Sequence, residues 1–270
     1  MPVDVEAEVL SNTRLSDEYC VIALRAPQLA AAIEPGQFVM VHASHGDTPL
    51  LRRPYSIFDL LRDSTGAPVG FSILNKRVGV GSRLLYEAEP GATFECLGPL
   101  GRPFSLVSPP AEAWMVAGGV GLAPFATLAE ALAARGTAMR LFYGGRSAAD
   151  LFCLDRFERF GVALALTTED GTRGERGRVV LPLERDLTAA RAHPPVMVYA
   201  CGPEAMLAAV GRLAVRLGRP SELAMERQMG CGMGGCYSCV VRVRTEDGGS
   251  RYARSCMEGP VFKGEDVLWE

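Results

Sequence analysis

Short hydrophobic runs separated by polar turns fill the first hundred residues. Between Val3 and Val9 apolar residues alternate with acidic ones, which is the period of two expected of a half-buried strand. Five more such runs follow, divided by glycine and proline turns, at residues 19–24, 38–41, 55–60, 69–74 and 93–97. With a single short helical stretch near residues 82–86, this pattern predicts an antiparallel β-barrel over residues 1–108.

The pattern changes after the linker-like sequence Ser108-Pro109-Pro110. Apolar runs at 114–117, 139–143, 162–166 and 196–200 now alternate with helical stretches at 124–135 and 203–217. Pro203 just inside a helix start and Gly218 just past its end fit the usual helix asymmetry. Strands that alternate with helices predict a parallel sheet covered by helices, here over residues 109–220. A small third domain is expected over residues 221–270, with short strands at 240–244 and 261–269.

Four of the eight cysteines gather in the last forty residues: Cys231, Cys236, Cys239 and Cys256. Four residues separate the first two, two residues the next pair, and sixteen residues precede the last. This is the plant-type ligand spacing of a [2Fe–2S] cluster, and the glycines among the first three allow a tight wrapping loop. A structural zinc site is the alternative. Zinc sites more often use two separated Cys-x2-Cys pairs, so the spacing favours iron and sulfur.

Two glycine turns each follow an apolar run and precede a helix. One runs from Gly118 through Gly119 and Gly121 to Pro124, and the other is Cys201-Gly202-Pro203. Turns of this kind direct backbone N–H groups and the positive helix end at a pyrophosphate. Two of them at the carboxyl ends of parallel strands predict one nucleotide-binding crevice.

Two further motifs lie in the predicted barrel. Arg53-Pro54-Tyr55-Ser56 offers a guanidinium, an aromatic ring and a hydroxyl, and Gly79-Val80-Gly81-Ser82 precedes the short helix. The second suits a phosphate. From these residues alone, an ordinary strand edge and an ordinary turn explain the motifs equally well.

Composition and charge exclude some classes of protein. With 48% hydrophobic and 22% charged residues the chain is typical of a folded globular protein. A net charge of −3 gives no basic face for nucleic acid. The most apolar stretch, residues 113–129, is interrupted by glycines and a proline and is shorter than the roughly 20 residues that span a membrane. We therefore expect no membrane span, no targeting segment, and a cytoplasmic location, where clustered thiols more often bind metal than form disulfides.

Taken together, the motifs resemble the ferredoxin-reductase-type flavoprotein family. Its marks are Arg-x-Tyr-Ser in a flavin-binding barrel, then Gly-Gly-x-Gly-x-Ala-Pro and Cys-Gly-Pro in a nicotinamide-binding domain. Within that family, the cysteine cluster and the residues leading into it are similar to those of the electron-transfer subunits of class 1B dihydroorotate dehydrogenase. The resemblance runs the whole length of the chain in the same order.

The resemblance implies roles for individual residues. Arg53 and Pro54 would lie at the FAD pyrophosphate, Tyr55 on the isoalloxazine, and Ser56 near N5 of the flavin. Phosphate contacts would come from Gly79, Gly81 and Ser82. The NAD site would be lined by Gly119, Gly121 and Pro124 and closed near the nicotinamide by Cys201, Gly202 and Pro203. Ser56 and Cys201 are then the candidate catalytic residues. Tyr55 stands where this subunit usually has an aliphatic residue, and Ser82 replaces the more usual Thr.

The implied cofactors fix an order of electron flow. A nicotinamide exchanges two electrons as a hydride and a [2Fe–2S] cluster exchanges one, so a flavin, which can do both, belongs between them. The resemblance implies a relay to NAD⁺ from an FMN-containing dihydroorotate dehydrogenase catalytic subunit, in a heterotetramer that serves pyrimidine biosynthesis. Two alternatives stay open: an NAD(P)H-dependent reductase subunit of another complex, sulfide- or hydrogenase-linked, and a zinc-containing nucleotide-binding regulator.

Overall fold

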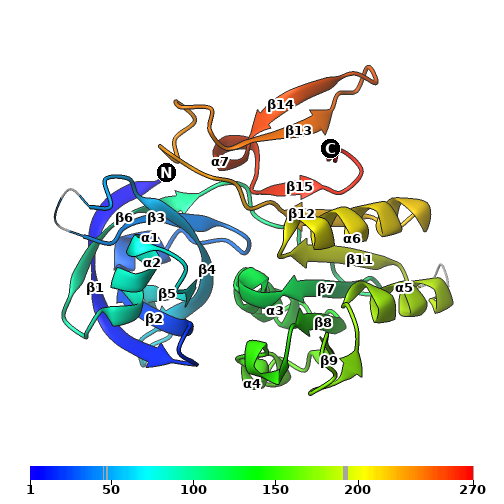
Figure 1. The fold of residues 1–270 in the computed structure, drawn as a ribbon, viewed down its shortest axis with the longest axis horizontal. Coiled ribbons are helices and arrows are strands. Elements are labelled where there is room, and N and C mark those ends of the chain that lie inside the picture. The colour runs from blue at the N-terminus through cyan, green and yellow to red at the C-terminus, as the bar shows by residue number, and fades with distance from the viewer. Residues whose placement is uncertain (45, 47, 191–193, 270) are drawn as a thin grey trace.

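Six antiparallel strands close into a barrel at the N-terminal end of the chain (Figure 1). The computed structural model describes residues 1–44, 46, 48–190 and 194–269. The barrel strands are β1 (Val3–Arg14), β2 (Tyr19–Arg25), β3 (Phe38–His42), β4 (Arg53–Arg62), β5 (Pro68–Lys76) and β6 (Thr93–Leu100). They follow one another around the barrel in the order β1-β2-β5-β4-β3-β6. The predicted antiparallel barrel is confirmed, and its short helix is α2 (Val80–Glu87). A single further turn, α1 (Pro27–Ala30), was not predicted.

Strand β3 divides its side chains between the two faces of the barrel wall. Val39 and Val41 point inward and pack in the barrel core with Ile22 and Ile73. Phe38 and Met40 belong to a separate buried cluster on the outer face. This alternation is the normal consequence of the strand repeat. It leaves two large apolar side chains outside the barrel, available to a neighbouring segment.

A seven-stranded sheet forms the second body of the molecule (Figure 1). Its strands are β7 (Glu112–Gly118), β8 (Met139–Gly145), β9 (Ala163–Thr168), β10 (Glu175–Arg176), β11 (Val196–Cys201), β12 (Ser221–Ala224) and β15 (Val261–Lys263). The order is β10-β9-β8-β7-β11-β12-β15, and β15 alone runs antiparallel to its neighbour. The predicted parallel sheet is therefore confirmed.

Helices cover both faces of this sheet. On one face lie α3 (Phe125–Ala133) and α4 (Leu154–Glu158), and on the other α5 (Val180–Ala189) and α6 (Glu204–Arg216). Short 3₁₀ turns precede two of them, η1 (Gly119–Leu122) and η2 (Ala148–Asp150). The apolar pattern did not reveal α5, because Pro182 sits in its first turn and its buried side chains are few. A proline is tolerated there, since the first N–H groups of a helix have no intrahelical partner.

The C-terminal segment leaves the sheet and returns to it. After β12 come the cysteine-rich loop, a hairpin of β13 (Val240–Arg244) and β14 (Ser250–Arg254), and the single turn α7 (Ser255–Glu258), before the chain re-enters the sheet as β15. The strand expected over residues 261–269 is shorter, because the chain turns at Gly264, whose N–H donates to Ser221 O. The predicted domain boundary at residue 220 falls just before β12, so both sheet strands of this segment lie beyond it.

The barrel and the sheet pack directly against each other. Phe104 in the connecting segment contacts the rings of Phe125 and Tyr199, with centroid separations of 5.9 and 5.4 Å. Asp59 of β4 accepts a hydrogen bond from Arg156 of α4 in a largely buried ion pair.

Over the described residues, no helix combines the length and apolar character needed to cross a membrane.

Candidate flavin, nucleotide and iron–sulfur sites

The four clustered cysteines stand as two pairs. The thiol of Cys236 interacts with that of Cys231, and the thiol of Cys256 with that of Cys239, whose Sγ also lies 3.5 Å from the Cys256 N–H. Within the described ranges, no three His, Cys, Asp or Glu side chains converge on one point as a ready site for a single ion. A [2Fe–2S] cluster needs four thiolates shared between two irons. Two pairs on one short loop and one adjacent turn fit that donor set.

Cys236 loses its thiol proton more readily than Cys256 does. Hydrogen bonds from Ser238, whose Oγ lies 3.1 Å from Cys236 Sγ, and from Cys231 lower the pKa of Cys236 to about 6. Burial raises the pKa of Cys256 to about 12. The exposed thiol is thus a ready ligand at neutral pH, whereas the buried one is ionised when a metal replaces its proton.

The cysteine loop sits on the outer face of the barrel. Cys239, Cys256 and Met229 are packed with Phe38 and Met40 of β3 and with two leucines of β6, Leu97 and Leu100. A Cβ on Gly232, which has a left-handed φ of +69°, would lie 2.6 Å from Met40 Cγ. Only glycine permits this approach, so the predicted role of the loop glycines extends to docking the loop on the barrel.

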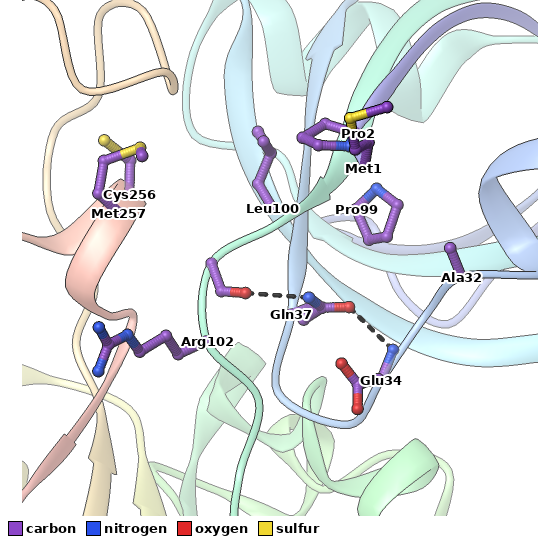
Figure 2. A pocket seen from close by; sticks show the side chains of 11 residues that line it. Met1, Pro2, Ala32, Glu34, Gln37, Pro99, Leu100, Arg102, Cys256 and Met257 are labelled. Carbon is purple, nitrogen blue, oxygen red and sulfur yellow. Dashed lines mark hydrogen bonds between the residues drawn. The ribbon is translucent and has the colours of Figure 1, made fainter.

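A cleft of about 320 Å³ opens between α7 and the end of the barrel. Figure 2 shows Cys256 and Met257 on one wall, and Met1, Pro2 and Pro99 on the other. Gln37 supports the floor by donating to Gly101 O, at 2.9 Å. A cysteine ligand therefore lines a cavity that reaches the protein surface.

The motif Arg53-Pro54-Tyr55-Ser56 begins β4, directly beside β3. Ser56 is paired in register with Phe38, and Pro54 with Met40. Paired residues share a face of the sheet, so Ser56 and Pro54 lie on the same outer face as the residues that seat the cysteine loop.

The side chains of Arg53 and Tyr55 lie on the opposite face of β4 from those of Pro54 and Ser56. The Tyr55 ring packs against the barrel core, and burial raises the pKa of its hydroxyl, so the phenol stays neutral. Within the described residues, the exposed Arg53 guanidinium donates through Nη1 to the carbonyls of Leu51 and Arg52, at 3.1 and 3.3 Å. An exposed guanidinium can bind an anion through its other N–H groups.

The second barrel motif forms the start of α2, next to Arg53. A Cβ on Gly81 would lie 3.7 Å from Arg53 Cγ, and one on Gly79 would meet no described atom within 4 Å. The Ser82 hydroxyl accepts from the N–H groups of Val78 and Gly79 at 2.8 and 2.9 Å. Ser82 thus caps the helix. The phosphate contact predicted for Ser82 stays a prediction, and the N–H groups of the first helical turn are further candidate donors to a phosphate.

Exposed apolar side chains surround this opening. They are Leu50, Leu51, Val78 and Val80, of which Leu50 and Val78 are 76% and 78% exposed. Large exposed apolar groups on a folded chain usually mark a contact surface. An open glycine cradle, an exposed guanidinium and an apolar rim together fit a bound flavin nucleotide.

The two glycine turns of the sheet meet at adjacent strands. Ala117 of β7 pairs with Cys201 of β11, so the two turns begin side by side. A Cβ on Gly121 would lie 2.2 Å from Cys201 O, and one on Gly202 would lie 3.0 Å from Gly118 N. Gly119 has a φ of +56° and faces space free of described atoms within 4 Å, while Pro124 caps α3. The two turns are in direct contact, and glycine is sterically required on both sides of that contact. The nucleotide-binding crevice at these turns stays a prediction.

Cys201 ends β11 beside this crevice. Burial, and then the nearby Glu226 carboxylate, raise the pKa of its thiol to about 12, so it is neutral at physiological pH. Glu226 also lines a cavity of about 200 Å³ with Gly202, Pro203 and Met225. The sequence did not single out Glu226, although it lies in the lead into the cysteine loop. Its position two residues after β12, the strand next to β11, is the feature from which it could have been predicted.

Ser56 and Cys201, the two candidate catalytic residues, come from different bodies. The contact between those bodies includes Leu122 and Ala123 of the first glycine turn, which belong to the same buried cluster as Phe58 of β4. The nucleotide turn therefore rests on the strand that carries Ser56. A flavin barrel, a dinucleotide sheet and a thiolate cluster in mutual contact define a reductase-type electron-transfer flavoprotein.

Comparison with known proteins narrows this class. Residues 115–212 match the family described as oxidoreductase NAD-binding domain, and residues 226–268 match the iron–sulfur cluster binding domain of dihydroorotate dehydrogenase B. A dihydroorotate dehydrogenase B (NAD⁺) electron transfer subunit from Desulforamulus reducens is 33% identical over 98% of both chains. Its counterpart from Geobacillus kaustophilus is 37% identical over 87% of both chains. The chain belongs to the family of dihydroorotate dehydrogenase B electron transfer subunits.

A solved structure shows the same arrangement. The structure of an NADH-dependent reduced ferredoxin–NADP oxidoreductase superposes with a TM-score of 0.82 at 26% identity, over 97% of this chain and 90% of that one. The family predicted from the sequence is thus confirmed, together with its iron–sulfur, flavin and NAD cofactors. The iron–sulfur match also removes the zinc alternative.

Proposed function

We propose that this chain relays electrons from the FMN of a partner dihydroorotate dehydrogenase subunit, through its [2Fe–2S] cluster and FAD, to NAD⁺ in pyrimidine biosynthesis. The observation that carries the proposal is the position of β3. Its outer face packs against Cys239 and Cys256, and its neighbour β4 places Ser56 beside Phe38. The cluster and the flavin motif are thereby one strand apart, with apolar side chains filling the space.

We assign the site residues to three groups, which bind FAD, NAD and the [2Fe–2S] cluster. Arg53 and the first turn of α2, with Gly79, Gly81 and the cap Ser82, hold the FAD phosphates, while Pro54, Tyr55 and Ser56 position the ring. The crevice formed by Gly119, Gly121, Pro124, Gly202 and Pro203 holds NAD and places the nicotinamide near Cys201. The four clustered cysteines bind the [2Fe–2S] centre. When bound, the flavin supplies the exchange between hydride and single-electron chemistry.

The partner docks, in this proposal, on the exposed apolar surface around the cluster. Met233, Tyr237 and Met257 are 63%, 60% and 48% exposed, and Met257 also lines the cleft of Figure 2. Methionine and aromatic residues are enriched in protein–protein contacts. An electron must reach the cluster at close range, so the partner's contact has to cover this face.

Reconstitution tests the proposal. The chain alone should oxidise NADH with artificial acceptors but should not oxidise dihydroorotate. Adding an FMN-containing dihydroorotate dehydrogenase subunit from the same source should create NAD⁺-linked dihydroorotate oxidation. Tyr237→Asp should weaken the coupled activity and spare the NADH-acceptor reaction. Val215→Asp on α6, which is 56% exposed, is the matched control and should spare both. Loss of coupling in the control, or none in Tyr237→Asp, would remove the docking surface from the proposal.

Assembly and location belong to the same proposal. We infer a heterotetramer in the cytoplasm. None of the eight cysteines, all of which the structure describes, forms a disulfide, as a reducing compartment favours. Sedimentation of the mixed subunits measures the stoichiometry.

A second candidate rests on the likeness to the NADH-dependent ferredoxin–NADP oxidoreductase, which extends over 97% of the chain. In that case the chain would serve as an NAD(P)H-dependent reductase subunit of another complex. Tight binding to an unrelated oxidoreductase, together with failure to bind the FMN subunit, would support it.

A further inference from the structure

Arg254 connects the two chain segments that supply the cluster ligands. It is the last residue of β14, two positions before Cys256. Its side chain crosses back to the cysteine loop, where Nη1 donates to Gly234 O at 2.9 Å and the guanidinium carbon lies 4.9 Å from the centre of the Tyr237 ring. One cation thus bridges the turn that carries one ligand and the loop that carries three.

Gly234 lies in the loop between Cys231 and Cys236, and it touches both Arg254 and the turn of Cys256. Its carbonyl accepts from Arg254 Nη1 at 2.9 Å. A Cβ on Gly234 would lie 2.8 Å from Cγ of Met257, the residue after Cys256. The guanidinium therefore holds the loop of three ligands where it packs on the turn that carries the fourth.

The same contacts hold a strained loop. Gly234 and Tyr237 have φ values of +80° and +57°, and a left-handed conformation is unfavourable for a residue such as tyrosine. Arg254 binds the first of these residues and stacks on the second. Without it, both would lose a contact that fixes the loop around the cluster.

Among the described residues, no ion pair within 4 Å involves the Arg254 guanidinium. The nearby Glu258 carboxylate accepts from the Arg254 backbone N–H at 3.2 Å, but its charge is paired with Arg251 at 2.6 Å. Four thiolates and two sulfides give a [2Fe–2S] centre net negative charge, which increases on reduction. Hydrogen bonds to the sulfurs and nearby charge set the potential of such centres.

We propose that Arg254 is a positioning residue that holds the ligand loop, at Gly234 and Tyr237, against the turn of Cys256, and that its positive charge raises the reduction potential of the cluster. This inference rests on the [2Fe–2S] assignment of the proposed function. It goes beyond that assignment by naming the residue that makes the cluster a better electron acceptor.

Redox titration of the purified holoprotein, followed by the EPR signal of the reduced cluster, tests the proposal. Arg254→Gln removes the charge, and Arg254→Lys keeps it without the planar fork. Arg242→Gln removes the same charge from the same hairpin, at an exposed side chain that donates to Ser250 Oγ. Iron content and the EPR signal of the wild type are measured first, because their absence would refute the cluster assignment itself.

We expect the variants to differ in the reduction potential of the cluster. Arg254→Gln should shift the potential to lower values, so that at the wild-type midpoint the reduced fraction falls several-fold. Arg254→Lys should fall between it and the wild type, and Arg242→Gln should match the wild type. An unchanged potential in Arg254→Gln, or an equal shift in Arg242→Gln, overturns the proposal. If Arg254→Gln fails to assemble a cluster, Arg254→Lys decides. A lysine variant that is also empty would show a purely structural role.

Discussion

Gly121→Ala should disable the nucleotide crevice by forcing its two turns apart. The added Cβ would lie 2.2 Å from Cys201 O, 2.5 Å from Cys201 C and 2.6 Å from Gly202 Cα. All three atoms are backbone, so no side chain can rotate away. Non-bonded contacts are favourable only at about 3.5–4.0 Å, so the turns must separate by more than about 1 Å. A misplacement of about 1 Å can cost about 100-fold in rate, and overpacking costs about 1–3 kcal/mol of stability.

Anaerobic stopped-flow mixing with NADH measures this effect as the rate of flavin bleaching. Urea unfolding of the FAD-loaded protein measures the loss of stability. Gly136→Ala is the control: its φ is +68°, and a Cβ there meets no described atom within 4 Å. It should cost about 1 kcal/mol for the left-handed backbone and leave hydride transfer unchanged. Hydride transfer within about twofold of the wild type in Gly121→Ala would refute the steric reasoning.

Three other variants test separate parts of the site. Cys256→Ser should lower the iron content and the EPR signal while NADH still reduces the flavin, because hydride enters from the sheet rather than from β3; a collapse of flavin reduction in an FAD-loaded mutant would contradict this order. Cys201→Ala should slow hydride transfer without altering its pH profile between about pH 6 and 9, because burial raises the pKa of the thiol to about 12 and the folded chain keeps this proton. The stability that this proton gives the folded wild type is present below the ordinary thiol pKa of 9.0 and is lost as the pH rises toward 12. The mutant should therefore lose less stability than the wild type in that alkaline range. Asp59→Ala leaves the Arg156 guanidinium unpaired at the interface and should cost about 1–3 kcal/mol in urea unfolding, much of which a second change, Arg156→Leu, should restore.

Local sequence signals were sufficient to predict the order of the bodies and most strands. The period of two in the barrel and the alternation of strands with helices reflect which face of each element is buried. The four cysteines whose spacing predicted a cluster, Cys231, Cys236, Cys239 and Cys256, form two pairs of thiols in the structure. These features depend on neighbours in sequence, so they can be predicted from the sequence.

The contacts between segments were not predictable in the same way. The seating of Gly232 against Met40 joins residues almost two hundred positions apart, and Arg254 meets Gly234 only after the hairpin folds back. Ser82 gives another example. Its hydroxyl, for which the resemblance implies a phosphate contact, also caps α2 by accepting from the N–H groups of Val78 and Gly79. The sequence did not reveal this second role, because it depends on how the loop folds back before the helix.

The cysteine segment is held at both ends by the sheet, and we expect this to couple the two electron-transfer steps. Ala224, where the segment leaves β12, pairs with Cys201 on one side and with Val261, where the segment returns, on the other. The middle of the segment packs on β3 through Phe38 and Met40. A rotation of the sheet that widened the nicotinamide crevice would therefore also shift the cluster along the barrel. Loosening the interface with Asp59→Ala should slow flavin reduction by NADH and cluster reduction by the flavin together. A variant that slowed only one of them would show that the two distances are set independently.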